Sequence, residues 1–139
     1  MNTAIEMHDS YLNLIAVGPS GGGSVLLEAY VHRSDREPGR SNGEGGLQFI
    51  RLTLADMAIE GEVGELPKYL YEGSLTVGED VQDNMVPFPA KHEGAIRLYM
   101  MLAEDARVVI ATGTSVMIEP EGEFSFVETF EPSPSCRTT

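Results

Sequence analysis

The sequence predicts an all-β protein, an antiparallel meander of about nine strands closed as a barrel. Short runs of alternating apolar and polar residues follow one another, separated by glycine, proline and acidic clusters, and no stretch has the spacing of an amphipathic helix. So many twisted strands must curl up or fold over, which leaves a two-sheet β-sandwich as the alternative. Long runs and short turns favour the barrel. The expected strands are Thr3–Met7, Tyr11–Val17, Val25–His32, Leu47–Glu60, Tyr69–Val77, Asn84–Phe88, Gly94–Leu102, Arg107–Ile118 and Glu123–Phe130.

The first strands are defined by alternation and by turn residues. We expect Thr3–Met7 and Tyr11–Val17 to be separate strands, because the turn-prone residues His8-Asp9-Ser10 lie between them. A glycine-rich loop, Gly18–Ser24, then leads into the strand Val25–His32. The apolar positions on one face of that strand are Val25, Leu27, Ala29 and Val31.

The segment Leu47–Glu60 changes its apolar face part-way along. Apolar residues fall on even positions up to Leu54 and on odd positions from Ala55 onward. A strand cannot change its buried face without an extra residue. We therefore predict either a β-bulge near Leu54-Ala55 or a sharp bend between two strands there. The polar residues before this segment, 34–46, are expected to form a long loop.

The second half of the chain reads as further strands joined by short turns. Pro87 cannot donate a ladder hydrogen bond, so the strand Asn84–Phe88 should lie at an edge or a bulge. The strands Gly94–Leu102 and Arg107–Ile118 are expected to form a hairpin, with a kink at Gly113. Alternation places Ile96, Leu98, Met100, Leu102, Val108 and Ile110 inward, and Met101 and Val109 outward.

Length, charge and cysteine content limit the class of protein. The 139 residues fit one domain, for which we expect residues 1–131 to fold and 132–139 to form a flexible C-terminal tail. A formal charge of −13 repels phosphate groups, so we expect no nucleic-acid or membrane partner. A single cysteine, Cys136, and the lack of a secretory signal or membrane span predict a cytoplasmic location.

Two local motifs do not meet the requirements of the sites that they suggest. His8-Asp9-Ser10 has the residue types of a hydrolytic triad, but consecutive residues cannot align nucleophile, base and orienting acid. We expect Asp9 to bond backbone N–H groups in an Asx-type turn instead. The loop Gly18–Ser24 lacks the lysine and the following helix of a phosphate-binding loop. Neither motif therefore predicts catalysis.

No metal or cofactor site is predicted. The histidines His8, His32 and His92 lack the local spacing of zinc ligands, and there is no second cysteine to help them. Acidic residues cluster at 79–84 and at 119–123, but neither cluster follows the pattern of a calcium-binding loop. We expect both clusters to be solvated turns.

Glu128 is the first candidate site residue. It shares strand parity with Phe124, Phe126 and Phe130, so we expect it to face the interior or an inter-sheet surface. A buried carboxylate needs a partner, for which Arg51 or Arg97 is available in otherwise apolar strands. Three readings remain open: a structural ion pair, a local bulge that buries Val127 instead, and a ligand-facing or catalytic acid in a barrel mouth.

Tyr99 and Tyr71 are the other candidate ligand-binding residues, and Tyr69 belongs to the same group. Tyrosines with this spacing suit a sugar-binding face, but they are also good strand formers with a polar tip. The absence of tryptophan weakens the carbohydrate interpretation. Packing on a half-buried face is therefore the competing interpretation.

Together these observations favour a non-enzymatic binding or self-assembly module. The alternative is a small-ligand-binding β-barrel in which Glu128, Tyr99 and Tyr71 are polar contacts, and a third candidate is a carboxylate-dependent enzyme. The expected partner is a second copy in a homodimer, another protein or a small molecule. The semi-apolar outer faces of Gly94–Leu102 and Arg107–Ile118 motivate the homodimer.

Overall fold

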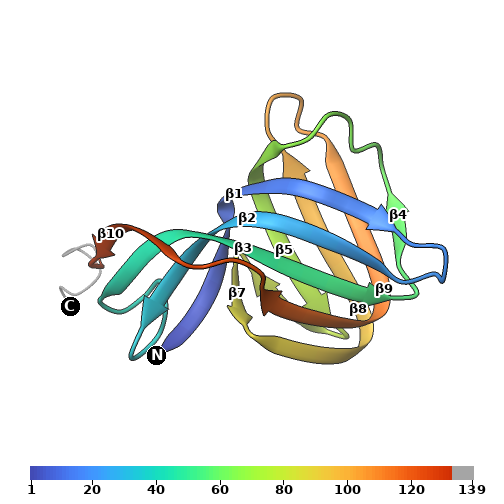
Figure 1. The fold of residues 1–139 in the computed structure, drawn as a ribbon. Coiled ribbons are helices and arrows are strands. Elements are labelled where there is room, and N and C mark those ends of the chain that lie inside the picture. The colour runs from blue at the N-terminus through green and yellow to red at the C-terminus, as the bar shows by residue number, and fades with distance from the viewer. Residues whose placement is uncertain (133–139) are drawn as a thin grey trace.

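The structure is a computed structural model that describes residues 1–132 (Figure 1). Regular structure in these residues is β-strand throughout, which confirms the all-β class. The strands are β1 (Asn2–Val17), β2 (Gly23–Ser34), β3 (Gly43–Ala55), β4 (Ala58–Glu60), β5 (Lys68–Val77), β6 (Asp80–Asp83), β7 (Met85–Phe88), β8 (Ala90–Leu102), β9 (Val108–Pro120) and β10 (Ser125–Phe130).

Six of these strands close into an antiparallel barrel. Their order is β3-β2-β1-β5-β8-β9, and β9 returns to pair with β3 from Ile50↔Pro120 to Ala55↔Ser115. The predicted barrel is therefore confirmed, and the two-sheet sandwich does not form. Strands β1 to β3 form a simple meander, whereas the pairs β1–β5 and β3–β9 join strands that are distant in the sequence.

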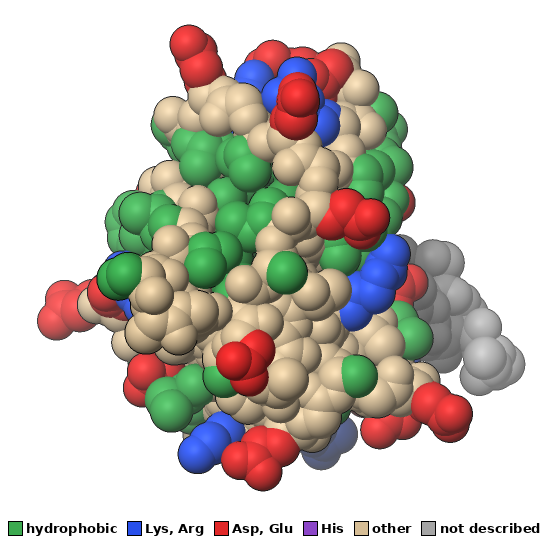
Figure 2. Space-filling view, turned by 90° about the vertical axis from the view of Figure 1, so that its right-hand side faces the viewer, with side chains coloured by type: hydrophobic (Ala, Val, Ile, Leu, Met, Phe, Trp, Pro, Cys, Tyr) green, Lys and Arg blue, Asp and Glu red, His purple; other side chains and the backbone are tan. Residues whose placement is uncertain are grey.

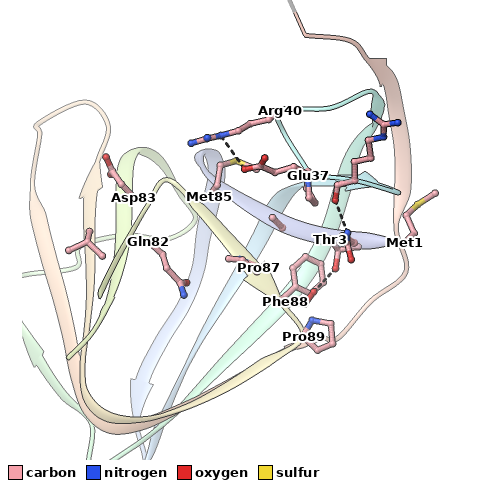
Figure 3. Close-up of a pocket in the computed structure, with 15 residues that line it drawn as sticks. Met1, Thr3, Glu37, Arg40, Gln82, Asp83, Met85, Pro87, Phe88 and Pro89 are labelled. Carbon is pink, nitrogen blue, oxygen red and sulfur yellow. Dashed lines mark hydrogen bonds and ion pairs between the residues drawn. The ribbon is translucent and has the colours of Figure 1, made fainter. Parts of the chain in front are cut away.

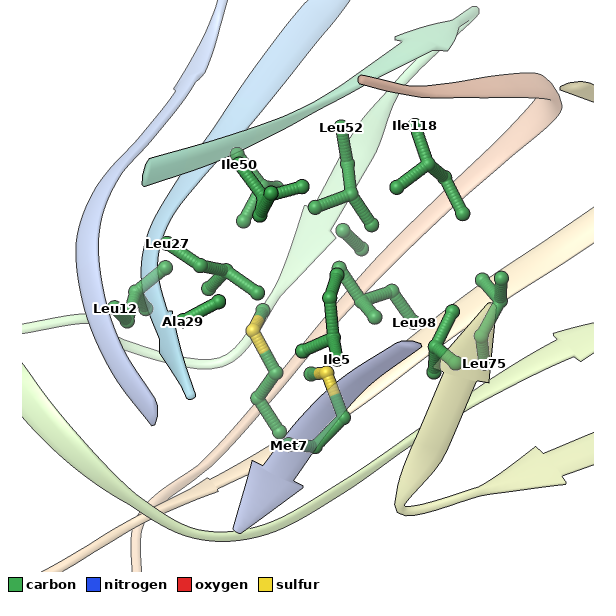
Figure 4. Packing of buried hydrophobic residues seen from close by; sticks show 14 of the residues in the cluster. Ile5, Met7, Leu12, Leu27, Ala29, Ile50, Leu52, Leu75, Leu98 and Ile118 are labelled. Atoms are coloured by element: carbon green, nitrogen blue, oxygen red, sulfur yellow. The ribbon is translucent and has the colours of Figure 1, made fainter. Parts of the chain in front are cut away.

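Apolar side chains fill the barrel interior. Leu27, Leu52 and Leu98 are fully buried there, with Met7 and Ile50 among them (Figure 4). Burying one such side chain is worth about 1.5–3 kcal/mol relative to leaving it in water. Because this space is occupied, a ligand site has to lie outside the core.

Strand β1 is continuous, so the prediction of two strands separated by a turn is wrong. Its pairing with β2 jumps from Glu6↔Tyr30 to Tyr11↔Glu28, so the residues from Met7 to Ser10 form a large bulge opposite Ala29. Asp9 adopts a φ of 79° there. Ser10 closes the bulge, because its Oγ donates to the Glu6 carbonyl at 2.7 Å and accepts from the Tyr30 N–H at 3.0 Å.

On the N-terminal side of this bulge the same sheet continues outside the barrel, and we call this part the extension sheet. It consists of the first residues of β1, the end of β2 and the start of β3, flanked by β7 and β10. Figure 1 shows the start of β1 and all of β10 lying to the left of the barrel. Pro87 is in β7, which pairs with β1 alone among the described strands, and this confirms its predicted edge position.

The irregularity predicted near Leu54-Ala55 is a bend between two strands. Strand β3 ends at Ala55, Asp56 adopts a φ of 51°, and β4 begins at Ala58. Leu54 and Met57 are both buried, so the left-handed residue between them lets the chain return an apolar side chain to the core.

The hairpin of β8 and β9 forms as predicted and the inner face of β8 is confirmed, but the prediction for the inner face of β9 is wrong. Val109 is buried opposite Met100, whereas Val108 and Ile110 are only half-buried. The buried parity of β9 changes beyond Gly113, where the β8–β9 register shifts between Glu93 and Ile96. Figure 2 shows hydrophobic side chains gathered on the face at the right-hand side of Figure 1, with charged side chains around them.

Two further points complete the fold. Residues 133–139 lie outside the described residues. They include Cys136 and all of the predicted tail except Pro132. Within the described part of the chain, no helix has the length and apolarity needed to cross a membrane.

Candidate functional site

Strand β10 forms one edge of the extension sheet. It pairs with β3 from Ser125↔Leu47 to Phe130↔Gly43, and among residues 1–132 it has no second neighbour. An unpaired edge exposes backbone N–H and C=O groups that can bond another strand. Two apolar side chains accompany this edge, since Phe126 is 55% exposed and Val127 is 52% exposed.

A bulge at Val127 sets the faces of β10. Phe126 lies opposite Gly46 and Glu128 lies opposite Gly45, so Val127 is the extra residue between them. Gly45 and Gly46 are adjacent on β3 and therefore belong to opposite faces. Glu128 consequently points away from the face of Phe126, and the prediction that it shares that parity and faces the interior is wrong: its side chain is exposed.

Glu128 nevertheless has a hydrogen-bonding partner, which is Tyr30 rather than an arginine. The Tyr30 hydroxyl donates to Glu128 Oε1. The ring of Tyr30 reaches β10 by crossing above Gly45, where an added Cβ would clash with the tyrosine oxygen. Burial and the adjacent Glu128 carboxylate raise the pKa of Tyr30 well above its ordinary value.

His32 anchors the end of β10 on the same face. The Phe130 ring packs edge-on against the imidazole, with centroids 4.8 Å apart and an interplanar angle of 82°. His32 is only 3% exposed, and its Nε2 lies 2.8 Å from Glu6 Oε1. Through these two contacts, buried His32 ties β10 to β1 and β2.

The residue just before β10, Phe124, lies on the opposite face of the extension sheet. Phe124 packs over Gly46, and the Arg33 guanidinium lies 3.7 Å from the centre of its ring. Arg33 also forms an ion pair with Glu44 at 2.6 Å. A partly exposed cation over an aromatic face contributes about 0.5–2 kcal/mol. Strand β10 is thus fastened on both of its faces.

A second tyrosine–carboxylate contact lies at the β1 bulge. The Tyr69 hydroxyl donates to Asp9 Oδ1, which raises the pKa of Tyr69 to about 12. The same hydrogen bond lowers the pKa of Asp9. Asp9 therefore accepts from a side chain of β5 and does not form the predicted Asx-type turn.

Ser10 and His32, the hydroxyl and the imidazole nearest to this region, are engaged in hydrogen bonds within the fold. The Ser10 oxygen is engaged by two backbone groups, and His32 directs Nε2 to Glu6, so no activated nucleophile is assembled from them. Within residues 1–132, no three His, Cys, Asp or Glu side chains are grouped so as to hold a metal ion. The contacts of Tyr30 with Glu128 and of His32 with Phe130 hold β10 in place. Among residues 1–132, the outer edge of β10 is left unpaired.

The predicted site residues are distributed over separate strands. Tyr99 lies on β8, half-buried, with its hydroxyl 3.3 Å from Glu72 Oε1. Tyr71 lies on β5 and is 62% exposed, while Glu128 lies on β10. Among the described residues, no hydrogen bond or ring contact joins these three side chains.

The arginines proposed as partners of Glu128 are engaged elsewhere. Arg51 forms an ion pair with Glu121 at 2.9 Å, and Arg97 lies 5.8 Å from the centre of the Tyr99 ring. The residues that do meet Glu128 and Phe130 are Tyr30 and His32 of β2. The glycine-rich run 43–46 was the one sequence signal of close packing against a neighbouring strand.

Comparison with known proteins finds no matching family, no similar curated protein and no similar solved structure. The function therefore has to be inferred from the geometry alone.

Proposed function

We propose that this protein is a non-enzymatic binding module that self-assembles by pairing the outer edge of β10 with the same strand of a second copy. The observation that carries the proposal is an edge strand with no second neighbour among residues 1–132, flanked by the exposed side chains of Phe126 and Val127. Strand addition at such an edge supplies main-chain hydrogen bonds, while the flanking side chains add apolar contact.

A second copy is the partner that suits this edge most simply. A strand can pair with itself antiparallel about a twofold axis, so that the same residues meet from both sides. Strand β10 spans Ser125–Phe130, which corresponds to an edge of about 20 Å. Pairing two such edges joins two extension sheets into one continuous sheet.

The charge distribution of the chain agrees with an interface at this place. The whole chain carries a formal charge of −13, so two copies repel one another. Strand β10 contains a single charged residue, Glu128, and its carboxylate is hydrogen-bonded by Tyr30 within the same molecule. Self-association should therefore strengthen as salt screens the remaining charge, from about 50 mM to about 500 mM.

Sedimentation velocity over a range of protein concentrations tests the proposal. We expect a concentration-dependent dimer for the native chain. Val127→Lys should weaken dimerisation at least tenfold, because lysine on an edge strand opposes strand addition. Val17→Lys is the matched control, since Val17 is also exposed, at 44%, but lies at the far end of β1.

Three results would overturn the proposal. The first is a monomer at high micromolar concentration and high salt. The second is equal dimerisation by Val127→Lys and the native chain. The third is loss of the dimer in Ile110→Lys but not in Val127→Lys, which would move the interface to the outer face of β8 and β9.

A further inference from the structure

Four neighbouring strands of the barrel each carry one outward side chain at the same level, and we call these four residues the outer row. The register places Tyr69 of β5 opposite Tyr11 of β1. It also places Tyr11 opposite Glu28 of β2, and Glu28 opposite Phe49 of β3. Each has a core residue next to it along its own strand, so alternation turns all four side chains outward. These buried neighbours are Leu70, Leu12, Leu27 and Ile50.

Three of the four side chains in the outer row are aromatic and partly open to solvent. Tyr11 is 41% exposed and Phe49 is 38% exposed. Tyr69 is half-buried, and its ring meets that of Tyr11 with centroids 5.4 Å apart and an interplanar angle of 70°. The face of such a ring attracts a cation, most often a guanidinium.

Glu28 is the charged member of the outer row, and it stands between two rings. Tyr11 lies opposite it on β1 and Phe49 lies opposite it on β3. Directly opposed side chains have their Cβ atoms about 4.5–5.5 Å apart, so both rings flank the carboxylate. Glu28 is half-buried, yet within residues 1–132 its carboxylate forms no ion pair and accepts no side-chain hydrogen bond. A cation that brings its own N–H donors suits this position.

A second carboxylate lies at the β5 end of the outer row. The Tyr69 hydroxyl donates to Asp9 Oδ1, and this hydrogen bond lowers the pKa of Asp9. Asp9 is therefore ionised at neutral pH, and its side chain is 47% exposed. The neighbouring imidazole of His8 directs Nδ1 to the Tyr71 carbonyl at 2.9 Å, and its Nε2 lies 3.5 Å from Asp9 Oδ1.

The permanently charged cations nearest to the outer row are engaged within the fold. Arg51 of β3 forms an ion pair with Glu121 at 2.9 Å and donates to the Ser24 hydroxyl at 2.9 Å. Lys68, next to Tyr69, is paired with Glu104 at 3.2 Å. The whole chain carries a formal charge of −13. This face therefore offers carboxylates and aromatic rings to a cation from outside.

The cleft beside the extension sheet has no such preference for one charge (Figure 3). Its volume is about 850 Å³, and its lining includes Arg36 and Arg40 as well as Glu37 and Asp83. Arg40 and Glu37 form an ion pair with one another at 3.5 Å. Because both signs of charge line the cleft, it selects no class of ligand, whereas the outer row and Asp9 present carboxylates.

We propose that the outer row binds an arginine-bearing segment of a partner protein. One guanidinium pairs with the Glu28 carboxylate between the rings of Tyr11 and Phe49, and a second lies over Tyr69 beside Asp9. A guanidinium suits this face because it is planar, pairs with a carboxylate through two N–H groups and stacks on aromatic rings. With strands about 4.8 Å apart the outer row is about 14 Å long, which an extended segment of four or five residues at about 3.3 Å each covers. The outer row lies apart from the β10 edge, so this proposal does not rest on self-assembly.

Calorimetry and two-dimensional NMR of the full chain test this inference, with a hexapeptide of alternating arginine and serine as the probe. The titration is made at about 150 mM salt, which screens long-range attraction to the acidic chain. We expect saturable binding with amide shifts concentrated around the outer row. The same peptide with lysine in place of arginine should bind at least threefold more weakly, because an ammonium neither stacks on a ring nor pairs through two N–H groups in one plane.

Two sets of variants separate the contacts. Glu28→Gln should weaken binding of the arginine peptide about threefold or more, within the range of a partly exposed ion pair. Glu93→Gln is its matched control, because Glu93 is exposed on β8 and forms no ion pair within residues 1–132. Tyr11→Leu should weaken binding about fivefold, whereas Tyr11→Phe keeps the ring and should retain it. If Tyr11→Leu does not fold, the pair of glutamate variants decides alone.

Several results would overturn the proposal. Equal weakening by Glu28→Gln and Glu93→Gln would mean that only overall charge attracts the peptide. Equal binding of the arginine and lysine peptides would remove the selection of a guanidinium. Loss of self-association in Tyr11→Leu would show that a second copy covers the outer row. Binding of cellohexaose with the same amide shifts, and not of the arginine peptide, would assign the outer row to a sugar.

Discussion

The hydrogen bond from Tyr30 to Glu128 fastens β10, so its removal should have a measurable effect on stability. We consider the single variants Tyr30→Phe and Glu128→Ala and the double variant. Each single change removes one partner of the same bond. The double-variant cycle then isolates the coupling energy between the two side chains from their other contacts.

The structure sets the magnitude of this coupling. A hydrogen bond to a charged group contributes about 1.5–3 kcal/mol when shielded from water, and an exposed ion pair about 0.2–1 kcal/mol. Tyr30 is half-buried and Glu128 is exposed, so we expect a coupling of about 1 kcal/mol between these limits. A fully buried carboxylate would instead cost about 3–5 kcal/mol when its pairing is broken.

Urea unfolding followed by far-ultraviolet circular dichroism measures this energy, because the chain has no tryptophan to report by fluorescence. Protein concentration should be fixed, since dimerisation stabilises the folded state. The matched control is the cycle of Tyr99→Phe and Glu72→Ala, whose longer bond of 3.3 Å should couple by less than about 0.5 kcal/mol. A Tyr30–Glu128 coupling below that of the control would refute the proposed fastening of β10.

Two other predictions concern the tyrosine–carboxylate contact at the β1 bulge and the core. The pKa of Tyr69 is raised from 10.0 to about 12, so the folded state keeps the phenol proton to higher pH than the unfolded state does. The contribution of Tyr69 to the free energy of unfolding is therefore fully present below pH 10 and is lost as pH rises toward 12. Urea unfolding between these pH values should show a smaller loss of stability in Tyr69→Phe than in the native chain, and equal slopes would contradict the assignment. In the core, Leu98→Ala should lower the free energy of unfolding by about 2–5 kcal/mol, whereas Tyr71→Ala at an exposed position should change it by less than about 0.5 kcal/mol. A small effect of Leu98→Ala would mean that the barrel interior is less tightly packed than described.

Strand alternation predicted the regular parts of the fold. The inward positions of β2 from Val25 to Val31 and those of β8 from Ile96 to Leu102 are buried as expected. These strands have an apolar residue at every second position, and the core selects that face without ambiguity. The bend after Ala55 was also detectable, because the apolar positions themselves change parity there.

The errors all fall at bulges whose cause lies elsewhere in the sequence. A bulge at Val127 was one of the open readings and it is present, but that reading buried Val127, whereas Val127 is 52% exposed. The partner that fixes Glu128 is Tyr30, 98 residues away. Likewise, β9 changes its buried face beyond Gly113 because of its pairing with β8 and not because of its own pattern.

The candidate site was missed for a related reason. Glu128 was recognised as unusual, but its partners were sought among arginines, because a carboxylate on an apolar face suggests an ion pair. The partner in the structure is instead the Tyr30 hydroxyl, which can reach Glu128 because Gly45 has no side chain in its path. Exposure of the β10 edge could not be read from sequence at all, since it depends on strand order.

Hydrogen exchange at the backbone amides of β10 tests the central claim most directly. In an antiparallel pair with β3, some amides of Ser125–Phe130 point to β3 and the others point outward. Self-assembly through this edge predicts that the outward amides gain protection as protein concentration rises, and that Val127→Lys removes this gain while Val17→Lys preserves it. Identical exchange of the β10 amides at low and high protein concentration would contradict the account.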